Sequence, residues 1–317
     1  MRKVKIITAE QAAQLVKDND TITSIGFVSS AHPEALTKAL ENGFWKRTNR
    51  RTLPIFTQVR KGFATAALPN TWLIRAFWNG PSSVIGRPYR QSGSWLSIIK
   101  SKPITFLKAP SFDWFRALAG HKLGVFTDIG LETFLDPRQL GGKLNDVTKE
   151  DLVKLIEVEG HEQLFYPTFP VQVAFLRGTY ADESGNITMD EEIGPFESIS
   201  VAQAVHNCGG KVVVQVKDVV AHGSLDPRMV KIPGIYVDDV VIAAPEDHQQ
   251  TYDCQYDPSL SGEHRAPEGA ADEVLPMSAK KIIGRRGALE LTENAVVNLG
   301  VGAPEYVAFR LPVKKEY

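Results

Sequence analysis

The sequence predicts an α/β fold built on an open, mostly parallel sheet, and three observations lead to it. Short apolar runs rich in β-branched residues alternate with stretches that repeat at the helical period. Loops marked by Gly and Pro join these runs. The 317 residues are 43% hydrophobic and 23% charged, a globular composition sufficient for one large or two ordinary domains. Such alternation places helices on the faces of a sheet.

The first forty residues form the clearest strand–loop–helix unit. Residues 4–8 predict a short strand, and Thr8 can cap the helix that follows, with Gln11 at the capping-box position. Residues 21–27 predict an apolar strand. Pro33 then begins a helix, because proline suits the first helical turn.

The middle of the chain continues the same alternation. We expect, in order, a helix at 115–120, a strand at 123–128, an amphipathic helix at 147–158 capped by Thr148, a strand at 171–182, a helix at 198–210 that ends at Gly209, and strands at 211–220 and 236–245. Together these elements complete an N-terminal domain of residues 1–244.

A change of composition follows this domain. Residues 245–276 carry little apolar pattern and many Pro, Gly, Ser and acidic residues, which is typical of a linker. After it we expect a helix at 277–293, a strand at 295–302 and a new helix at 304–309. Residues 277–317 therefore predict the start of a second, truncated α/β domain.

Composition also narrows the class of protein. The formal net charge is -1, so the whole chain does not have the charge of a nucleic-acid binder. Cys208 and Cys254 are the two cysteines, and they form neither a disulfide framework nor a metal-ligand spacing. No apolar run of about 18 residues occurs, and the N-terminus has no signal-peptide pattern. We expect a cytoplasmic protein that binds neither nucleic acid nor membrane.

Two strand–loop–helix junctions carry glycines at the end of a strand. In the first, the candidate site residues are Gly26, Phe27, Val28 and Ser29; in the second, they are Gly300, Gly302 and Ala303. Glycine lets the backbone turn tightly, and the N–H groups of the next helix start can then face an anion or a carbonyl oxygen. For either loop alone, an ordinary strand-to-helix connection is the favoured interpretation.

Taken together, the two loops resemble those of the family I coenzyme A transferases. The first, from Asp18-Asn19 to Pro33, is similar to the amino-terminal signature of that family, with Ile25 and Ala31 in place of two glycines. The second, NLGVGAP, resembles the loop that opens the second domain of the family. The segments FTDIGLETFLDPRQLGGKLND, AVHNCGGKVVVQVKDVV and MVKIPGIYVDDVV resemble the fused, single-chain acetate and propionate CoA-transferases. The resemblance covers residues 1–41 and 113–308.

This resemblance implies a mechanism and its participants. A glutamate attacks an acyl-CoA thioester, an enzyme–CoA thioester forms through a mixed anhydride, and an acceptor carboxylate reverses the sequence. The first loop would stabilise the oxyanion and the second would bind coenzyme A, which is the carried group. No metal or resident cofactor is implied; the partners are an acyl-CoA and a short-chain carboxylate, and family members are expected to be homo-oligomers.

The catalytic residue of the family is absent from this sequence. In the family it lies in a Glu-x-Gly-x-x-Gly-Gly segment, and no such segment occurs in residues 1–317. We therefore assign no catalytic nucleophile and expect the chain alone to be inactive. Two other interpretations stay open: a non-catalytic protein that binds acyl-CoA or a sugar phosphate, and a half-subunit that pairs with a separately encoded second domain.

Three smaller groups of polar residues are interpreted as structural rather than catalytic or metal-binding. We interpret Ser29, Ser30 and His32 as polar groups of a loop rather than as a nucleophile and its base. The acidic residues Asp182, Glu183, Asp190, Glu191 and Glu192 predict a solvated turn rather than a metal site. His206 is expected at a helix end, with Cys208 beside it as a small buried residue.

The stretch from about residue 45 to 112 departs from every expected pattern. No Asp or Glu occurs between Asn42 and Phe112, whereas Trp45–Ser111 holds twelve Lys and Arg, four of the five Trp and six Pro. A shifted reading of the codons permits family-like sequence here and again at residues 309–317. We hypothesise that both stretches are translated in a shifted frame. The alternative is a genuine basic insertion that forms a nucleic-acid-binding patch.

Independent determination of the nucleotide sequence through codons 40–115 and beyond codon 317 tests this hypothesis. We expect single-base differences that restore family-like sequence and continue it into the glutamate segment. If the nucleotide sequence confirms the reading frame as given, the hypothesis of a sequencing error is wrong and the stretch is part of the protein. Its lysines and arginines would then occupy buried sheet positions and destabilise the domain.

Overall fold

The computed structural model describes residues 3–17, 20–26, 30–46, 55–57, 73–75, 108–143, 149, 151–251, 254–265, 276–300 and 302–310. The chain divides into two compact units. Unit 1 comprises residues 1–78 and 94–263, and unit 2 comprises residues 79–93 and 264–317. The two are described separately below.

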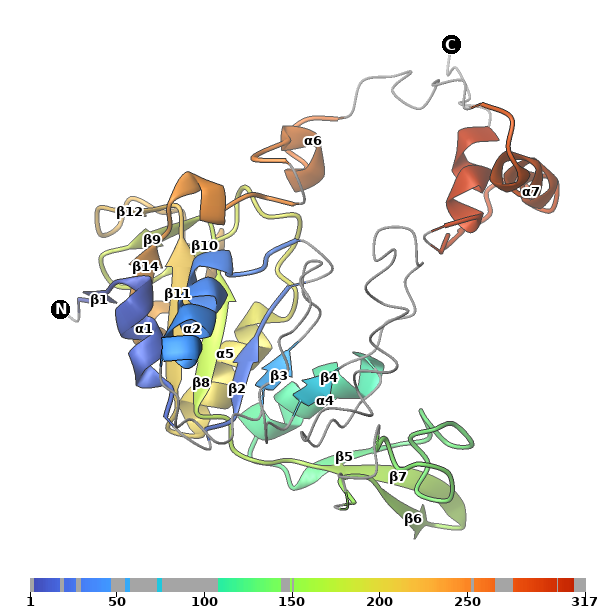
Figure 1. Ribbon diagram of the computed structural model, residues 1–317, viewed down its shortest axis with the longest axis horizontal. Coiled ribbons are helices and arrows are strands. Elements are labelled where there is room, and N and C mark those ends of the chain that lie inside the picture. Colours follow the sequence, from blue (N-terminus) through green and yellow to red (C-terminus); the bar gives the residue numbers. More distant parts are fainter. Residues whose placement is uncertain are drawn as a thin grey trace. The chain divides into compact units, whose positions relative to one another are not determined.

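A seven-stranded sheet forms the centre of unit 1 (Figure 1). Its strands lie in the order β1 (Lys5–Ile6), β14 (Asp239–Ile242), β11 (Lys211–Val216), β8 (Val173–Arg177), β2 (Ile22–Ser24), β3 (Ile55–Thr57) and β4 (Leu73–Arg75). Every neighbouring pair is parallel. The predicted α/β class with an open, mostly parallel sheet is therefore confirmed.

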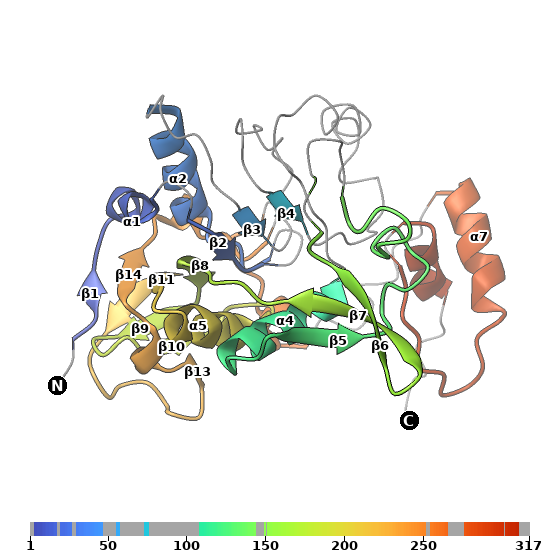
Figure 2. The same ribbon diagram turned by 90° about the horizontal axis from the view of Figure 1, so that it is seen from below.

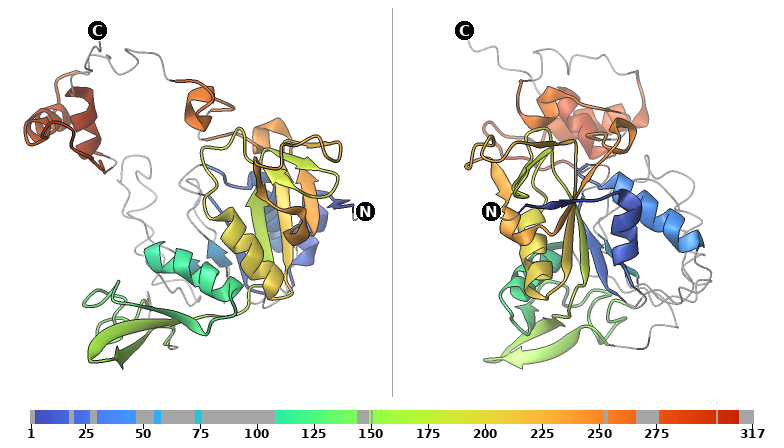
Figure 3. Two further views of the ribbon diagram at one scale, coloured as in Figure 1. Left: turned by 180° about the vertical axis from the view of Figure 1, so that it is seen from behind. Right: turned by 90° about the vertical axis from the view of Figure 1, so that its left-hand side faces the viewer.

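Helices cover both faces of this sheet (Figures 2 and 3). Helices α1 (Ala9–Leu15) and α2 (Glu34–Lys46) pack on one face, where Val173 and Phe175 of β8 join their core. Helices α4 (Lys108–Ala119) and α5 (Ser198–Asn207) pack on the other, against Ala174 and Leu176 of the same strand. Because successive strand residues point to opposite faces, a strand covered on both sides is apolar throughout.

Two smaller sheets complete unit 1. The first has the order β12 (Asp218–Val220), β9 (Tyr180–Asp182), β10 (Ile187–Thr188) and β13 (Val230–Ile232). Residues 171–182 and 211–220, each expected as one strand, therefore each form two strands that belong to different sheets. Gly178 marks one crossing: a Cβ there would lie 2.2 Å from Cγ2 of Ile187, so a side chain has no room.

The second small sheet corrects one expectation. It is antiparallel, in the order β5 (Gly124–Thr127), β7 (His161–Pro167) and β6 (Lys154–Val158). The predicted helix at 147–158 is wrong, because Lys154–Val158 is a strand. The reason lies in the turn: Glu159 and Gly160 have φ values of 52° and 80°, which suit a tight hairpin and end a helix.

The expected signals at the start of α1 and at the end of α5 are confirmed. Thr8 accepts from the Gln11 N–H at 3.2 Å, and the Gln11 side chain accepts from the Thr8 N–H at 2.9 Å, which is a capping box. His206 lies in the last turn of α5, and Gly209 follows with φ 72°. Residues 245–251, which include the short helix η2 (Pro245–Asp247), lie within unit 1.

Unit 2 contains α7 (Ala279–Ala288) and the 3-10 helix η3 (Pro304–Arg310). They pack closely, since a Cβ on Gly284 would lie 2.5 Å from the main chain of Tyr306. Residues 295–300, expected as part of a strand at 295–302, have no strand structure, so that prediction is wrong there. They lack a neighbouring strand among the described residues of the unit, and a strand needs one to satisfy its backbone.

Most of the atypical stretch from residue 45 to 112 lies outside the described residues. The exceptions are its ends, which belong to α2 and α4, and the strands β3 and β4. Residues 311–317 lie outside as well. Within the described ranges, no helix combines the length and the apolar character that crossing a membrane requires.

Candidate functional site

The carboxyl ends of four neighbouring strands meet at one edge of the large sheet. Arg177 of β8 stands beside Gln215 of β11, and Val216 of β11 stands beside Ile242 of β14. On the other side of β8, Ser24 at the end of β2 pairs with residue 175. In open α/β sheets this edge is the usual place of ligand binding. The candidate site is built here.

Arg177, the last residue of β8, holds this edge together. Its side chain is 3% exposed, and its Nε donates to Oε1 of Glu192 at 2.9 Å. Nη1 donates to the main-chain oxygens of Gln249 at 2.7 Å and His32 at 3.4 Å, and Nη2 donates to that of His248 at 3.4 Å. One guanidinium group therefore joins β8 to the turn after β10, the loop before α2 and the segment after β14.

Glu192 has one carboxylate oxygen in the ion pair and one without a partner. Oε1 binds Arg177 and lies 3.8 Å from Nε2 of His248, whereas Oε2 is buried and has no hydrogen-bond partner among the described residues. Burial raises the pKa of Glu192, although the charge of Arg177 opposes the shift. A buried acceptor without a donor costs about 1–3 kcal/mol, so a donor from a bound molecule would be stabilising.

Gln215, in the middle of an apolar strand, is bound to the start of α2. Its Oε1 accepts from the N–H groups of Ala35 at 2.9 Å and Leu36 at 3.4 Å. Its Nε2 donates to the main-chain oxygen of Asp247 at 2.8 Å. We expected the N–H groups at this helix start to face a ligand. For Ala35 and Leu36 this is wrong, because a protein side chain already accepts from them.

His248 lies between Gln215 and Glu192 and is neutral. Nε2 of Gln215 lies 3.1 Å from Nδ1 of His248, and an amide nitrogen can only donate, so the ring carries its hydrogen on Nε2. Burial lowers the pKa of His248 to about 3, and the positive charges of Arg177 and Lys217 act in the same direction.

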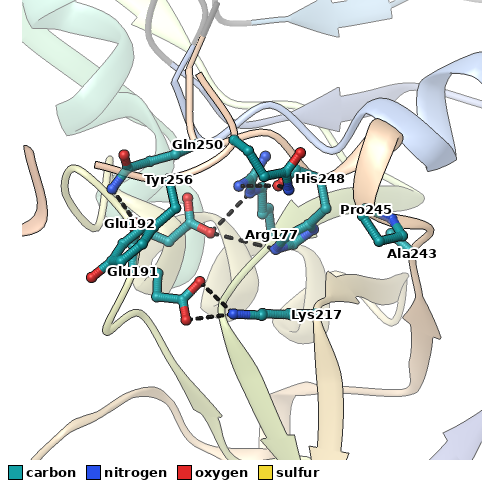
Figure 4. A pocket seen from close by; sticks show the side chains of 10 residues that line it. Arg177, Glu191, Glu192, Lys217, Ala243, Pro245, His248, Gln250 and Tyr256 are labelled. Atoms are coloured by element: carbon teal, nitrogen blue, oxygen red, sulfur yellow. Dashed lines mark hydrogen bonds and ion pairs between the residues drawn. The ribbon is translucent and has the colours of Figure 1, made fainter. Parts of the chain in front are cut away.

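A pocket of about 260 Å³ opens beside these groups (Figure 4). Lys217 lies at its rim, where Nζ contacts the two carboxylate oxygens of Glu191 at 2.6 and 2.9 Å. The hydroxyl of Tyr180 donates to the same carboxylate at 3.3 Å. The lining consists of Arg177, Glu191, Glu192, Lys217, Ala243, Pro245, His248, Gln250, Gln255 and Tyr256.

The first glycine loop begins at the same edge. Gly26 follows β2 with φ 131°, and a Cβ there would lie 3.1 Å from the main-chain oxygen of Ser30, so glycine is required. The predicted site residues Phe27, Val28 and Ser29 lie outside the described residues. Ala31 has φ 55°, a left-handed conformation that glycine adopts more easily, at the position where the family pattern has a glycine.

Ser30 and His32 have contacts that suit polar groups of a loop. The Ser30 hydroxyl donates to Oγ1 of Thr251 at 3.4 Å. Nε2 of His32 lies 2.9 Å from Oγ1 of Thr37 and 3.6 Å from Glu34. These contacts connect the loop to α2 and to the segment after β14, which agrees with the interpretation from sequence.

The second glycine loop belongs to unit 2. Gly302 is buried and has φ 121°, whereas a Cβ on Gly300 would meet only Pro304 at 3.8 Å. The main-chain oxygen of Ala303 accepts from the Tyr306 N–H at 3.2 Å. The backbone conformation therefore requires glycine at position 302.

The acidic residues at the end of β9 and after β10 differ from the expected solvated turn. Glu192 and Asp182 are 4% and 3% exposed, so the prediction is wrong for these two. Burial acts to raise the pKa of Asp182, but hydrogen bonds from Asn186 and Ser184 outweigh it and lower that pKa. Within the described ranges, no cluster of three or more His, Cys, Asp or Glu side chains is arranged to hold a metal ion.

A half-buried serine and an exposed histidine also lie beside the buried Asp182, but the three do not form a catalytic triad. The hydroxyl of Ser184 lies 2.7 Å from Nδ1 of His222. Asp182 lies 3.8 Å from the same nitrogen. In a triad the serine and the aspartate face opposite ring nitrogens, so this arrangement cannot relay a proton.

Sequence reasoning did not single out three central residues, Arg177, Gln215 and His248, and it assigned the fourth, Glu192, to a solvated turn. Two of them had a signal, because Arg177 ends the apolar run VAFLR and Gln215 interrupts VVVQV. A polar residue in a fully buried strand must find partners, and such a residue marks a network.

Replacement of Arg177 tests whether the ion pair supports this edge. We expect Arg177→Met to lower the free energy of unfolding by about 3–5 kcal/mol, because Glu192 would keep a buried charge without its partner. Urea denaturation followed by circular dichroism measures this change. The control is Arg177→Met combined with Glu192→Leu, which should recover at least half of the loss. A double variant as unstable as the single one would contradict the ion-pair explanation.

The buried histidine predicts a dependence of stability on pH. A histidine whose pKa is lower in the folded protein stabilises it above pH 6.5, and this contribution is lost as the pH falls toward 3. Between pH 7 and 4.5 the loss is about 2–3 kcal/mol. Glu192 acts in the opposite direction, since its raised pKa favours the folded state as the pH falls.

Two variants test whether His248 is the source of this pH dependence. His248→Asn keeps an acceptor for Gln215, and its free energy of unfolding should fall less between pH 7 and 4.5 than that of the unmodified chain. His161→Gln, at an exposed position of β7, is the matched control and should retain the full pH dependence. Equal slopes for His248→Asn and the unmodified chain would exclude His248 as the source.

The sequence and the fold are similar to those of known coenzyme A transferases. The profile of the family described as Coenzyme A transferase matches residues 112–243. The caffeate CoA-transferase of Acetobacterium woodii is 38% identical over 314 residues, covering 96% of this chain and 58% of that protein. The acetate CoA-transferase YdiF of Escherichia coli K12 is 31% identical over 309 residues, covering 95% of this chain and 56% of that protein.

A solved structure extends the comparison to the fold. The crystal structure of the Escherichia coli O157:H7 acyl-CoA transferase YdiF, as a thioester complex with CoA, is 29% identical with a TM-score of 0.82. It covers 96% of this chain and 58% of the crystallised chain. The chain thus spans somewhat more than half the length of these relatives. By the profile match, the sequence identity and the shared fold, the chain belongs to the coenzyme A transferase family.

Proposed function

We propose that this chain is the N-terminal part of an acyl-CoA:carboxylate CoA-transferase. The observation that supports this most directly is the alignment of 96% of the chain with the caffeate CoA-transferase of Acetobacterium woodii, at 38% identity. The edge of the sheet where β2, β8, β11 and β14 end is the ligand-binding position of such a fold. A short-chain acyl-CoA as donor and acetate or a similar acid as acceptor are the proposed substrates.

The proposed chemistry proceeds through a glutamyl thioester. A glutamate carboxylate attacks the thioester carbonyl, and the CoA thiolate leaves with the formation of a mixed anhydride. The thiolate then attacks the glutamyl carbonyl and releases the donor acid, and the acceptor carboxylate repeats these steps in reverse. Coenzyme A is the carried group, and the net reaction exchanges one carboxylate for another without an oxidant or a metal.

In this proposal, the chain binds and orients the substrates, and the glutamate nucleophile lies outside residues 1–317. Residues 1–317 contain no Glu-x-Gly-x-x-Gly-Gly segment. The loop that starts at Gly26 would supply N–H groups to the oxyanion, and the loop at Gly300, Gly302 and Ala303 would contact coenzyme A. The chain is proposed to comprise a first domain at 1–244, a linker at 245–276 and the start of a second domain at 277–317. Cytoplasmic location and homo-oligomer formation by the intact enzyme remain predictions.

A complementation assay tests the proposed function. The chain alone should transfer no CoA from acetyl-CoA to propionate, because it lacks the nucleophile. Addition of the remaining part of the Acetobacterium woodii caffeate CoA-transferase, expressed separately, should produce propionyl-CoA, measured by liquid chromatography.

The controls separate the alternatives. The added part alone, and the added part with its segment glutamate changed to glutamine, should both be inactive. Transfer by the unmixed chain would contradict the absence of a nucleophile. Coenzyme A binding without transfer in any mixture would instead favour a binding protein.

A further inference from the structure

We draw no further inference here: the strongest candidate, the exposed face of the three-stranded sheet β5–β7–β6 on which Phe126 stacks against Phe165 and Val158 is 44% exposed, is an unpartnered apolar face, and nothing in the described part of the chain shows what covers it.

Discussion

The buried guanidinium group of Arg177 is the constraint on which the candidate site depends. Its donors reach a carboxylate and three main-chain oxygens that belong to different parts of unit 1. A cation removed from water is stable only when nearly all of its donors have partners, so the partners must lie where the guanidinium plane directs them. This requirement fixes the loop before α2, the turn after β10 and the segment after β14 relative to one another. The geometry of the sheet edge is therefore a consequence of satisfying one buried charge.

Gln215 imposes a second constraint that changes the chemistry of the edge. A helix start that follows a parallel strand is a ready place for an anion, because its first N–H groups have no partners within the helix. Here the Gln215 side chain accepts from Ala35 and Leu36, and the start of α2 is thereby capped from a neighbouring strand. In the proposed function, the loop that starts at Gly26 would therefore make the ligand contacts that the start of α2 does not. Neutral His248 completes this arrangement, since it accepts from Gln215 and faces Glu192 without adding a charge.

The two units contribute differently to the proposed function. Unit 1 is built around a sheet whose strands are covered on both faces, and it contains the residues 112–243 that match the family profile. Unit 2 is small and leaves large apolar side chains such as Ile282, Ile283 and Leu289 more than half exposed. Among the described residues of unit 2, Val307 is the one large apolar side chain that the helix contact at Gly284 leaves buried. The two described helices of unit 2 do not cover their own apolar surface, which agrees with the proposal that they belong to the start of a larger domain.

The sequence by itself determined the α/β class, the capping box at Thr8, the glycine at position 26 and the resemblance to coenzyme A transferases, because these follow from local periodicity and short motifs. It did not determine the hairpin at Lys154–Pro167, where a helical apolar pattern competed with the turn at Glu159 and Gly160. Nor did it reveal that Glu192, His248 and Gln250 are buried, since their segments have the polar composition of a turn and a linker. Only the tertiary structure decided this. Arg177 draws these segments from positions 15 to 72 residues away, and satisfying a buried charge depends on distance in space rather than in sequence.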